Sequence, residues 1–278
     1  MSSGLKRNTI DKYYTNNFIV NEIINIIKSQ NIINKDDLII EPSAGNGAFI
    51  NGIKTLSNNY LFYDIEPEHK EIIKQDFLSL DLTNIINRYN NIHVIGNPPF
   101  GRQSATAIKF IKKCCLFSKS ISFILPKSFK KDSLKDKFNS FYHLIYENDL
   151  EKLNINSSFI LQDKTIDVPC IFQIWLKKDI ERIKTVKLKP VNFSFVKKTD
   201  NYDLAFRRVG VNAGYVETDK NKFGTLNVNC FYFIKINDDV NKDEFINKIK
   251  TLNFDFNNTV GPKSISKQEL INKMNLVF

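Results

Sequence analysis

The sequence has few of the residues from which metal centres and disulfide frameworks are built. Its 278 residues include four cysteines and three histidines, and neither set has a metal-ligand spacing. We therefore expect no metal site and no disulfides, which is typical of a reducing compartment. No run of 18 apolar residues occurs, so no membrane-spanning helix is expected. The first eleven residues are polar and lack the apolar core of an export signal, so we expect a cytoplasmic protein.

The composition is that of a folded, basic protein. Hydrophobic residues make up 42% of the chain and charged residues 25%, which excludes wholesale disorder and fits one large α/β domain with a small appendage. The net charge is +10, from 40 basic and 30 acidic residues, and Lys far outnumbers Arg. Two interpretations stay open: a codon bias toward Lys, Asn and Ile, or a polyanionic partner such as DNA or RNA.

Short apolar segments alternate with helical patterns along the first two thirds of the chain. Strands are expected at residues 37–40, 59–64, 92–96, 120–125 and 168–176, and helices at 15–29 and 104–118. This alternation predicts a parallel sheet with helices on both faces, and such sheets bind ligands beyond the carboxyl ends of their strands. The last hundred residues are mixed, with a strand expected at 230–236 and helices at 242–252 and 268–274.

The first two strands end in motifs that suit a nucleotide-like ligand. Strand 37–40 leads into Glu41-Pro-Ser-Ala-Gly-Asn-Gly, in which Gly45 and Gly47 permit a tight turn and close approach of a ligand to the backbone. The turn is neither a phosphate loop nor a complete dinucleotide fingerprint. The second strand ends at Asp64, about twenty residues further on, where a carboxylate can hold ribose hydroxyls. Alone, such a turn is often a simple strand-to-helix connection, but the acid at this spacing favours a ligand.

The third strand leads into Asn97-Pro98-Pro99-Phe100. Two prolines stop a strand and fix the backbone. The side-chain oxygen of Asn97 and the carbonyl of Pro98 could accept both N–H bonds of one planar amino group, which would leave the nitrogen lone pair free to attack an electrophilic methyl. Phe100 could stack on the face of an extruded base. The alternative is a purely structural proline turn with a core Phe, but the order of the three motifs favours a catalytic role for the tetrapeptide.

In this order the motifs resemble those of S-adenosylmethionine-dependent amino-methyltransferases, specifically the adenine-N6 branch with gamma-type motif order. The resemblance covers about residues 12–180 and includes Tyr13-Tyr14-Thr15 and Gln75-Asp76-Phe77-Leu78. It implies a doubly wound, Rossmann-like, seven-stranded α/β sheet in a catalytic domain of residues 1–185. Residues 186–278 would form a small C-terminal α+β appendage for substrate recognition.

The resemblance also implies S-adenosylmethionine as the cofactor and assigns roles to individual residues. Asp64 would hold the ribose hydroxyls, Asp76 would bond the adenine amine, and Phe77 would pack on that ring. Tyr14 and Thr15 would contact the methionine part. The remaining cofactor residues would be Glu41, Ser43, Gly45 and Gly47, and the catalytic residues would be Asn97, Pro98, Pro99 and Phe100.

The implied activity is methyl transfer to N6 of adenine in nucleic acid. The motif order and the C-terminal appendage favour DNA, with RNA close behind. Cytosine-N4 enzymes usually carry Ser-Pro-Pro and glutamine-N5 enzymes Asn-Pro-Pro-Tyr, so both are less favoured. A catalytically silent nucleic-acid-binding subunit of a methyltransferase complex is a further alternative, and the intact tetrapeptide argues against it.

Basic residues crowd the segment that follows the tetrapeptide. We expect some of them to contact phosphates, although a solvated helix surface would have the same pattern. The expected substrate contacts are Arg102, Lys127, Lys130 and Lys131, with Arg207 and Arg208 in the C-terminal region. We expect the chain to supply no Ser/His/Asp set. Cytosine-C5 methyltransferases use a Pro-Cys dipeptide such as Pro169-Cys170, but Cys170 lies in an apolar strand pattern and is expected in the core.

Overall fold

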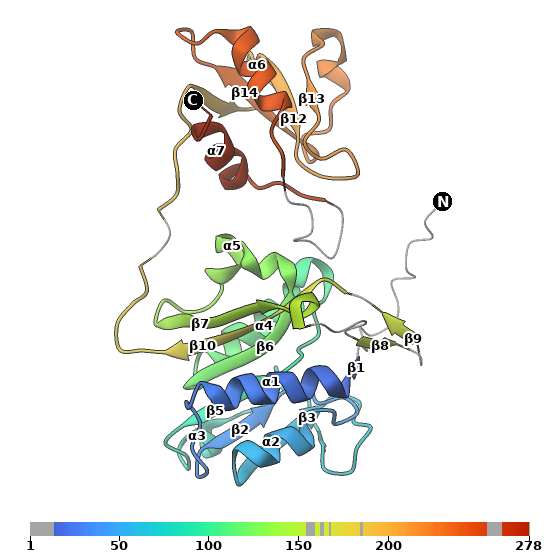
Figure 1. The fold of residues 1–278 in the computed structure, drawn as a ribbon, viewed down its shortest axis with the longest axis vertical. Coiled ribbons are helices and arrows are strands. Elements are labelled where there is room, and N and C mark those ends of the chain that lie inside the picture. Colours follow the sequence, from blue (N-terminus) through green and yellow to red (C-terminus); the bar gives the residue numbers. More distant parts are fainter. Residues whose placement is uncertain are drawn as a thin grey trace. The chain divides into compact units, whose positions relative to one another are not determined.

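The chain folds as two compact units, residues 1–184 and 185–278 (Figure 1). The computed structural model describes residues 14–153, 159–161, 164–166, 168–183, 186–254 and 263–277, so Tyr13 of the upstream motif lies outside the described residues. Within these ranges, none of the helices is long and apolar enough to cross a membrane. Each unit has its own sheet and is described by itself.

The first unit contains a seven-stranded sheet with the strand order β4-β3-β2-β5-β6-β10-β7. Strand β10 runs antiparallel to its neighbours β6 and β7, whereas the pairs from β4 to β6 are parallel. The strands are β2 (Leu38–Glu41), β3 (Asn59–Asp64), β4 (Ile73–Lys74), β5 (Ile92–Gly96), β6 (Ser120–Pro126), β7 (Tyr142–Asp149) and β10 (Cys170–Lys177). This architecture confirms the predicted Rossmann-like α/β fold.

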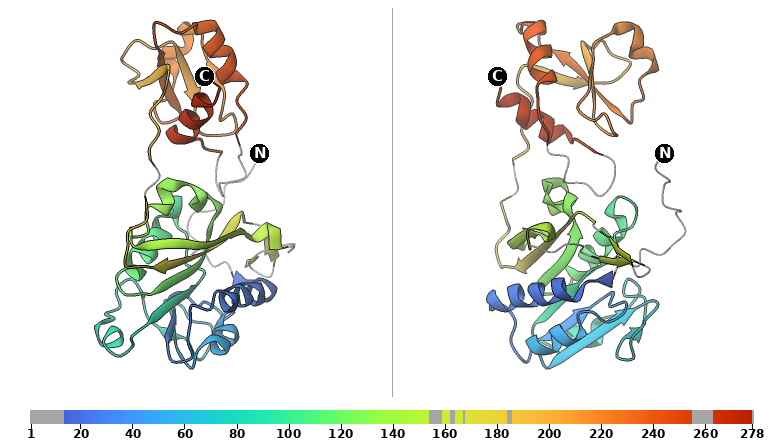
Figure 2. Two further views of the ribbon diagram at one scale, coloured as in Figure 1. Left: turned by 60° about the vertical axis from the view of Figure 1, so that its left-hand side comes forward. Right: turned by 45° about the vertical axis from the view of Figure 1, so that its right-hand side comes forward.

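Helices cover both faces of this sheet because its strands are apolar on both sides (Figures 1 and 2). On β2, Ile39 packs with α1 and α2, whereas Leu38 and Ile40 face the cluster that contains α4. The helices are α1 (Asn17–Ser29), α2 (Ile50–Leu56), α3 (Thr83–Ile86), α4 (Ala105–Cys114) and α5 (Asp132–Lys135), with the 3-10 turns η1 (Arg102–Ser104), η2 (Lys127–Lys130) and η3 (Leu150–Leu153).

A second, small antiparallel sheet of the first unit has the order β1-β8-β9. Its strands are β1 (Tyr14–Thr15), β8 (Phe159–Leu161) and β9 (Lys164–Ile166). Tyr14 pairs with Ile160 and Thr15 with Phe159. The start of the chain and the segment before β10 are therefore joined, although they are far apart in the sequence.

The second unit is built on a four-stranded antiparallel sheet with the order β11-β14-β12-β13. The elements are β11 (Phe193–Val196), β12 (Leu204–Arg207), β13 (Val216–Glu217), η4 (Lys220–Thr225), β14 (Phe231–Ile236), α6 (Lys242–Lys250) and α7 (Lys267–Asn275). Helices α6 and α7 pack on one face, where Phe245, Ile249 and Leu270 join the core (Figure 2). A smaller cluster around Tyr202 and Phe233 lies on the opposite face.

The strands that carry the motifs lie where the sequence predicts them. Strands β3 and β5 have the predicted bounds, and β2, β6 and β10 differ by one or two residues. The sequence did not predict β7. This strand lies at the edge of the sheet, and most of its side chains are only half-buried, so its sequence lacks a continuous apolar run.

Candidate cofactor and catalytic site

A cavity of about 220 Å³ opens at the carboxyl ends of the parallel strands, where this fold class binds ligands. Residues of the glycine turn, of the end of β3 and of the tetrapeptide after β5 all contribute to its wall. The lining residues are Tyr14, Pro42, Ser43, Gly45, Asp64, Ile65, Glu66, Glu68, Gln75, Asp76, Phe77, Leu78, Asn97, Pro99, Thr106 and Phe110. The cavity thus brings together side chains from motifs that are more than 80 residues apart.

Asp64 fastens the glycine turn to the end of β3. The amide of Gly45 donates to Asp64 Oδ2 (2.8 Å), and the amide of Glu66 donates to Oδ1 (2.8 Å). Gly45 has φ +52° and Gly47 has φ +84°, backbone conformations that residues other than glycine rarely adopt. A Cβ on Gly47 would also lie 2.7 Å from Ile50 Cδ1, so this glycine is needed for the shape of the turn, and it does not line the cavity.

An aromatic pair forms the apolar wall of the cavity. Phe77 is buried and stacks on Phe110 of α4, with 5.6 Å between the ring centroids. Asp76, the preceding residue, is exposed, and its Oδ1 accepts the amide of Leu78 (2.9 Å). Lys113 lies 5.2 Å from the Phe77 ring centroid and donates to the carbonyls of Leu78 and Leu80. The expected pair Asp76–Phe77 is therefore held at the cavity by the loop after β4 and by α4.

The tetrapeptide contributes Asn97 and Pro99 to the cavity, while Pro98 is buried and Phe100 packs half-buried against the core. Asn97 is held from two directions. Ser43 Oγ donates to its main-chain carbonyl (3.2 Å), and its own Nδ2 donates to Thr15 Oγ1 (3.3 Å). The carbonyl of Phe100 accepts the amides of Thr106 and Ala107 at the start of α4.

Glu41 lies buried next to Gly96, the residue before the tetrapeptide, and does not line the cavity. Its side chain packs on Gly96, where a Cβ would lie 3.3 Å from Glu41 Cγ. Burial, and to a lesser extent the charge of Asp64, raise the pKa of Glu41 well above its usual value. Its Oε2 is buried and has no hydrogen-bond partner among the described residues.

Residues 35–186, more than half of the chain, match the EDM2 methyltransferase-like domain. The chain belongs to this family. Two curated relatives are the ribosomal RNA small subunit methyltransferases A of Mycoplasma capricolum subsp. capricolum and Mycoplasma mycoides subsp. mycoides, which are 25% and 24% identical to it. Each alignment covers 96% of this chain and 97% of the relative.

Solved structures with a similar fold include the 23S rRNA methyltransferase ErmE (TM-score 0.42, 10% identity, 63% of this chain and 73% of that chain). Another is an rRNA methylase from Streptococcus thermophilus (TM-score 0.33, 12% identity, 58% of this chain and 93% of that chain). The family match and the curated relatives identify the protein as a methyltransferase, and its seven-stranded sheet is Rossmann-like.

Several residues of this methyltransferase that line the cavity were not assigned from the sequence. Glu66 and Glu68 follow Asp64 on the loop after β3. The only sequence feature that could have indicated them is the acid at every second position from Asp64 onward. Thr106 and Phe110 come from one face of α4, where no local pattern marks a ligand site. Four of the described lining residues are acids and none is Lys, Arg or His, so the cavity has a negative potential.

Two of the lysines expected to contact substrate are paired with acids. Lys127 is 7% exposed, and its Nζ lies 3.2 Å from Glu151 and 3.6 Å from Asp149. Lys130 Nζ lies 2.6 Å from Asp149. Because a buried, paired ammonium is unavailable to a phosphate, we do not retain Lys127 as a substrate contact and give Lys130 a mainly structural role. Arg102 is exposed directly after the tetrapeptide, and Lys131 is half-buried.

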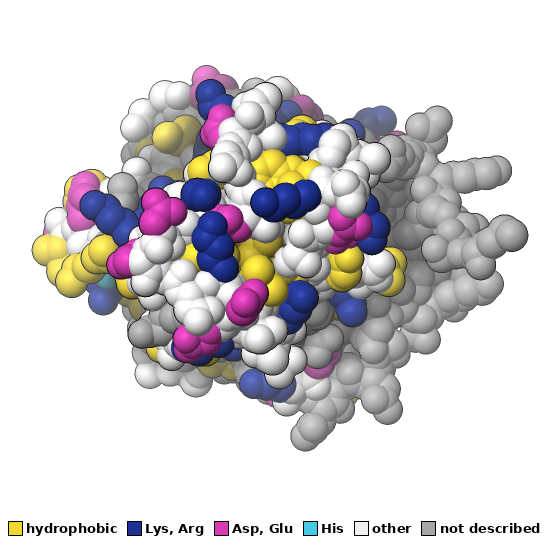
Figure 3. All heavy atoms as spheres, turned by 90° about the horizontal axis from the view of Figure 1, so that it is seen from above, with side chains coloured by type: hydrophobic (Ala, Val, Ile, Leu, Met, Phe, Trp, Pro, Cys, Tyr) yellow, Lys and Arg dark blue, Asp and Glu magenta, His cyan; other side chains and the backbone are white. Residues whose placement is uncertain are grey.

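The two arginines of the second unit lie beside aromatic rings of its sheet. Arg207 is 5.7 Å from the Phe231 ring centroid, and Arg208 is 5.0 Å from that of Tyr232. Lys267 also approaches Tyr232 (5.8 Å). On the face shown in Figure 3, basic side chains are interspersed with acidic ones and do not form a continuous patch. The roles of Arg207 and Arg208 in substrate binding stay predictions.

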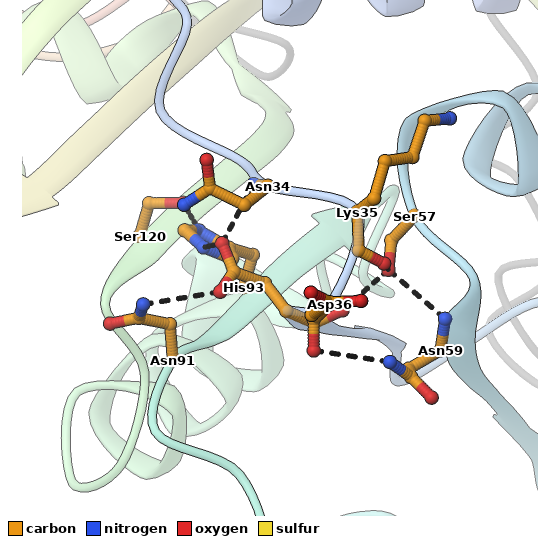
Figure 4. Close-up of polar contacts among 9 residues, drawn as sticks. Asn34, Lys35, Asp36, Ser57, Asn59, Asn91, His93 and Ser120 are labelled. Carbon is orange, nitrogen blue, oxygen red and sulfur yellow. Dashed lines mark hydrogen bonds and ion pairs between the residues drawn. The ribbon is translucent and has the colours of Figure 1, made fainter.

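A Ser/His/Asp set does exist, but it lies at the amino ends of the strands, whereas the cavity lies at their carboxyl ends. Figure 4 shows His93 and Ser120 of this set. His93 is fully buried. Its Nδ1 lies 2.7 Å from Ser120 Oγ, and its Nε2 lies 3.2 Å from Asp37 Oδ2. The prediction that the chain supplies no such set is therefore wrong, because the three side chains lie within hydrogen-bond distance in the order Ser120, His93, Asp37. Ser120 is also fully buried, so the set joins β5, β6 and the residue before β2 and cannot meet a substrate.

The cysteines of the first unit are placed as core residues. Cys114 and Cys170 are fully buried, and Cys115 is partly buried. Burial raises the pKa of Cys170, so its thiol is a poor nucleophile near neutral pH. This agrees with a core role for the Pro-Cys dipeptide.

Proposed function

We propose that this methyltransferase transfers the methyl group of S-adenosylmethionine to N6 of adenine in RNA. The observation that carries the proposal is that one cavity is lined both by the Gly45 turn with Asp64 and by Asn97 of the tetrapeptide. A cofactor held at the first group would therefore lie beside the second. Such juxtaposition is the main requirement for a direct transfer between two bound molecules.

S-adenosylmethionine is the cofactor, and the residues at the cavity suit it. When bound, it supplies an electrophilic methyl on a cationic sulfonium, which the acidic wall favours over a neutral molecule. Asp64 would hold the ribose hydroxyls, Asp76 the adenine amine, and Phe77 with Phe110 would pack on the ring. Tyr14 closes the cavity over Gly45, and its Oη donates to Glu68 (2.5 Å).

The tetrapeptide would hold the target amine. Asn97 Oδ1 and the carbonyl of Pro98 would accept its two N–H bonds, so that its lone pair is less delocalised into the base. Phe100 would stack on the base once it is out of its helix or already unpaired. The cavity lining holds no Lys or His among the described residues, so the proton released from the amine passes to solvent or to a carboxylate.

RNA replaces DNA as the proposed substrate. The motif order had favoured DNA, but the curated relatives that match 96% of the chain are named as ribosomal RNA methyltransferases.

The test is a transfer assay with methyl-labelled S-adenosylmethionine on small-subunit rRNA, mRNA and duplex DNA, followed by mass spectrometry of the nucleosides. We expect N6-methylated adenosine from RNA. Exclusive appearance of N6-methyldeoxyadenosine would return the substrate to DNA. A methylated cytosine product would refute the adenine assignment. Absence of cofactor binding by calorimetry would favour the catalytically silent subunit.

The matched variant is Asn97→Ala. It should lower transfer at least about a hundredfold, because it removes an acceptor used in the transition state. Cofactor affinity should change little, since Asn97 is expected to contact the target amine. Ser128→Ala, on the loop after β6 and outside the cavity lining, serves as the control variant.

A further inference from the structure

The two residues of strand β1 have different surroundings, because one lines the cavity and the other does not. Tyr14 lines the cavity, its ring lies 3.4 Å from the position of a Cβ on Gly45, and its Oη reaches Glu68. Adjacent side chains of a strand point to opposite sides. Thr15 accordingly points away, is 6% exposed and is not part of the cavity lining.

Thr15 instead contacts Asn97. Asn97 Nδ2 donates to Thr15 Oγ1 at 3.3 Å. A primary amide has a donor end and an acceptor end, and its last torsion is broad and roughly two-fold. Fixing the nitrogen on Thr15 therefore fixes the oxygen on the opposite side. Ser43 holds the main chain of the same residue, so only the side-chain rotation is left for Thr15 to set.

We propose that Thr15 is a positioning residue that orients the amide of Asn97, so that Oδ1 faces the amine to be methylated. This rests on the proposed function, and it differs from the contact with the methionine part that the sequence resemblance implied. Thr15 is itself held by the pairing of β1 with β8, where it lies opposite Phe159. Tyr14 and Thr15 thus connect closure over the cofactor with the orientation of the catalytic amide.

The experiment compares Thr15→Val, which keeps the shape and removes the hydroxyl, with Thr15→Ser, which keeps the hydroxyl. The full chain is assayed on a small-subunit rRNA transcript. We expect Thr15→Val to lower kcat about tenfold to a hundredfold, with the KM and the calorimetric Kd for S-adenosylmethionine changed less than about twofold. Thr15→Ser should restore kcat to within about threefold of the original chain.

The control variant is Thr55→Val on α2, whose hydroxyl bonds only the carbonyl of Gly52 among the contacts described. An unchanged kcat in Thr15→Val would overturn the proposal. A large rise in cofactor Kd at unchanged kcat would also overturn it, because it would place Thr15 on the cofactor.

A second measurement does not depend on methyl transfer. With asparagine labelled by ¹⁵N, the side-chain amide signals of Asn97 are assigned from their loss in Asn97→Asp. These signals should shift in Thr15→Val and stay in place in Thr15→Ser. Unshifted signals in Thr15→Val refute the contact. If no RNA is methylated by the original chain, the proposed function fails, while this spectrum still decides whether Thr15 holds the Asn97 amide.

Discussion

The buried cluster of Asp37, His93 and Ser120 makes the stability of the first unit depend on pH. An ionised Asp37 only accepts hydrogen bonds, so Nε2 of a neutral His93 carries the proton, and Ser120 donates to Nδ1. Burial lowers the pKa of His93 below its usual value, and the charge of Asp37 opposes this only in part. The neutral imidazole is therefore the form that the folded protein prefers.

The sign and size of the effect follow from this lowered pKa. Below a pH of about 6.5, the unfolded chain binds a proton at this histidine that the folded chain does not bind. The free energy of unfolding should therefore fall with falling pH, by up to about 1.4 kcal/mol per pH unit, until the lowered pKa is reached.

Asp37 contributes in a separate, more acidic window. Burial raises its pKa, but the amide of Asn34, the side chain of Asn91 and His93 outweigh this and lower it. Its contribution is present above its ordinary pKa of 3.8 and is lost only as the pH falls below that value. Between about pH 6.5 and pH 4, the loss of stability from this cluster therefore comes from His93.

The assay is denaturant unfolding followed by tryptophan fluorescence at pH values from 7.5 to 5.0. Trp175 is the single tryptophan of the chain and is buried in the first unit, so the signal reports that unit. His93→Gln should flatten the dependence below pH 6.5. His143→Gln, which removes an imidazole bonded to the carbonyl of Ile180, is the control and should keep it. An unfolding free energy that is flat from pH 7 to 5 in the original chain, or equally steep in His93→Gln, would refute the reasoning.

Three further outcomes are expected. Asp64→Ala should weaken S-adenosylmethionine binding at least about tenfold by calorimetry, because the ribose ligand and the acceptor for the Gly45 amide are both lost; unchanged binding would move the ribose elsewhere. Lys127→Ala should lower the unfolding free energy by about 1 to 3 kcal/mol, since it leaves buried Asp149 with Lys130 as its remaining cation among the described residues; an unchanged transition of Trp175 fluorescence would contradict this. Arg102→Ala should reduce the salt slope of RNA affinity by about one, and Lys127→Met, if folded, should not; equal slopes in all variants would remove Arg102 from the phosphate contacts.

The sequence predicted the parts of the site that lie at strand ends. A short apolar run, followed by an acid, a glycine turn or a double proline, indicates both a buried strand and a polar group at its end. Because parallel strands end at one edge of a sheet, the sequence alone places Gly45, Asp64 and Asn97 close together. The structure confirms that they line one cavity.

The remaining site residues depend on packing between segments that no local pattern connects. Glu68 reaches the cavity through the bond from Tyr14, and Phe110 through its stack on Phe77. Lys127 meets its acidic partners at the end of β7 and in η3, and β7 was not predicted. The charge pattern of the sequence could not distinguish this buried lysine from an exposed one.

The sequence by itself determined the class of fold, the order of the motifs and the type of residue at each strand end, because these depend on local periodicity and residue type. Tertiary structure alone decided which hydroxyl holds Asn97, which basic residues are paired, and that a Ser/His/Asp set is sealed at the opposite edge of the sheet. The reason is physical. Contacts between Thr15 and Asn97 or between Asp37 and His93 form only when the sheet is assembled, and their burial depends on neighbours that come from other elements.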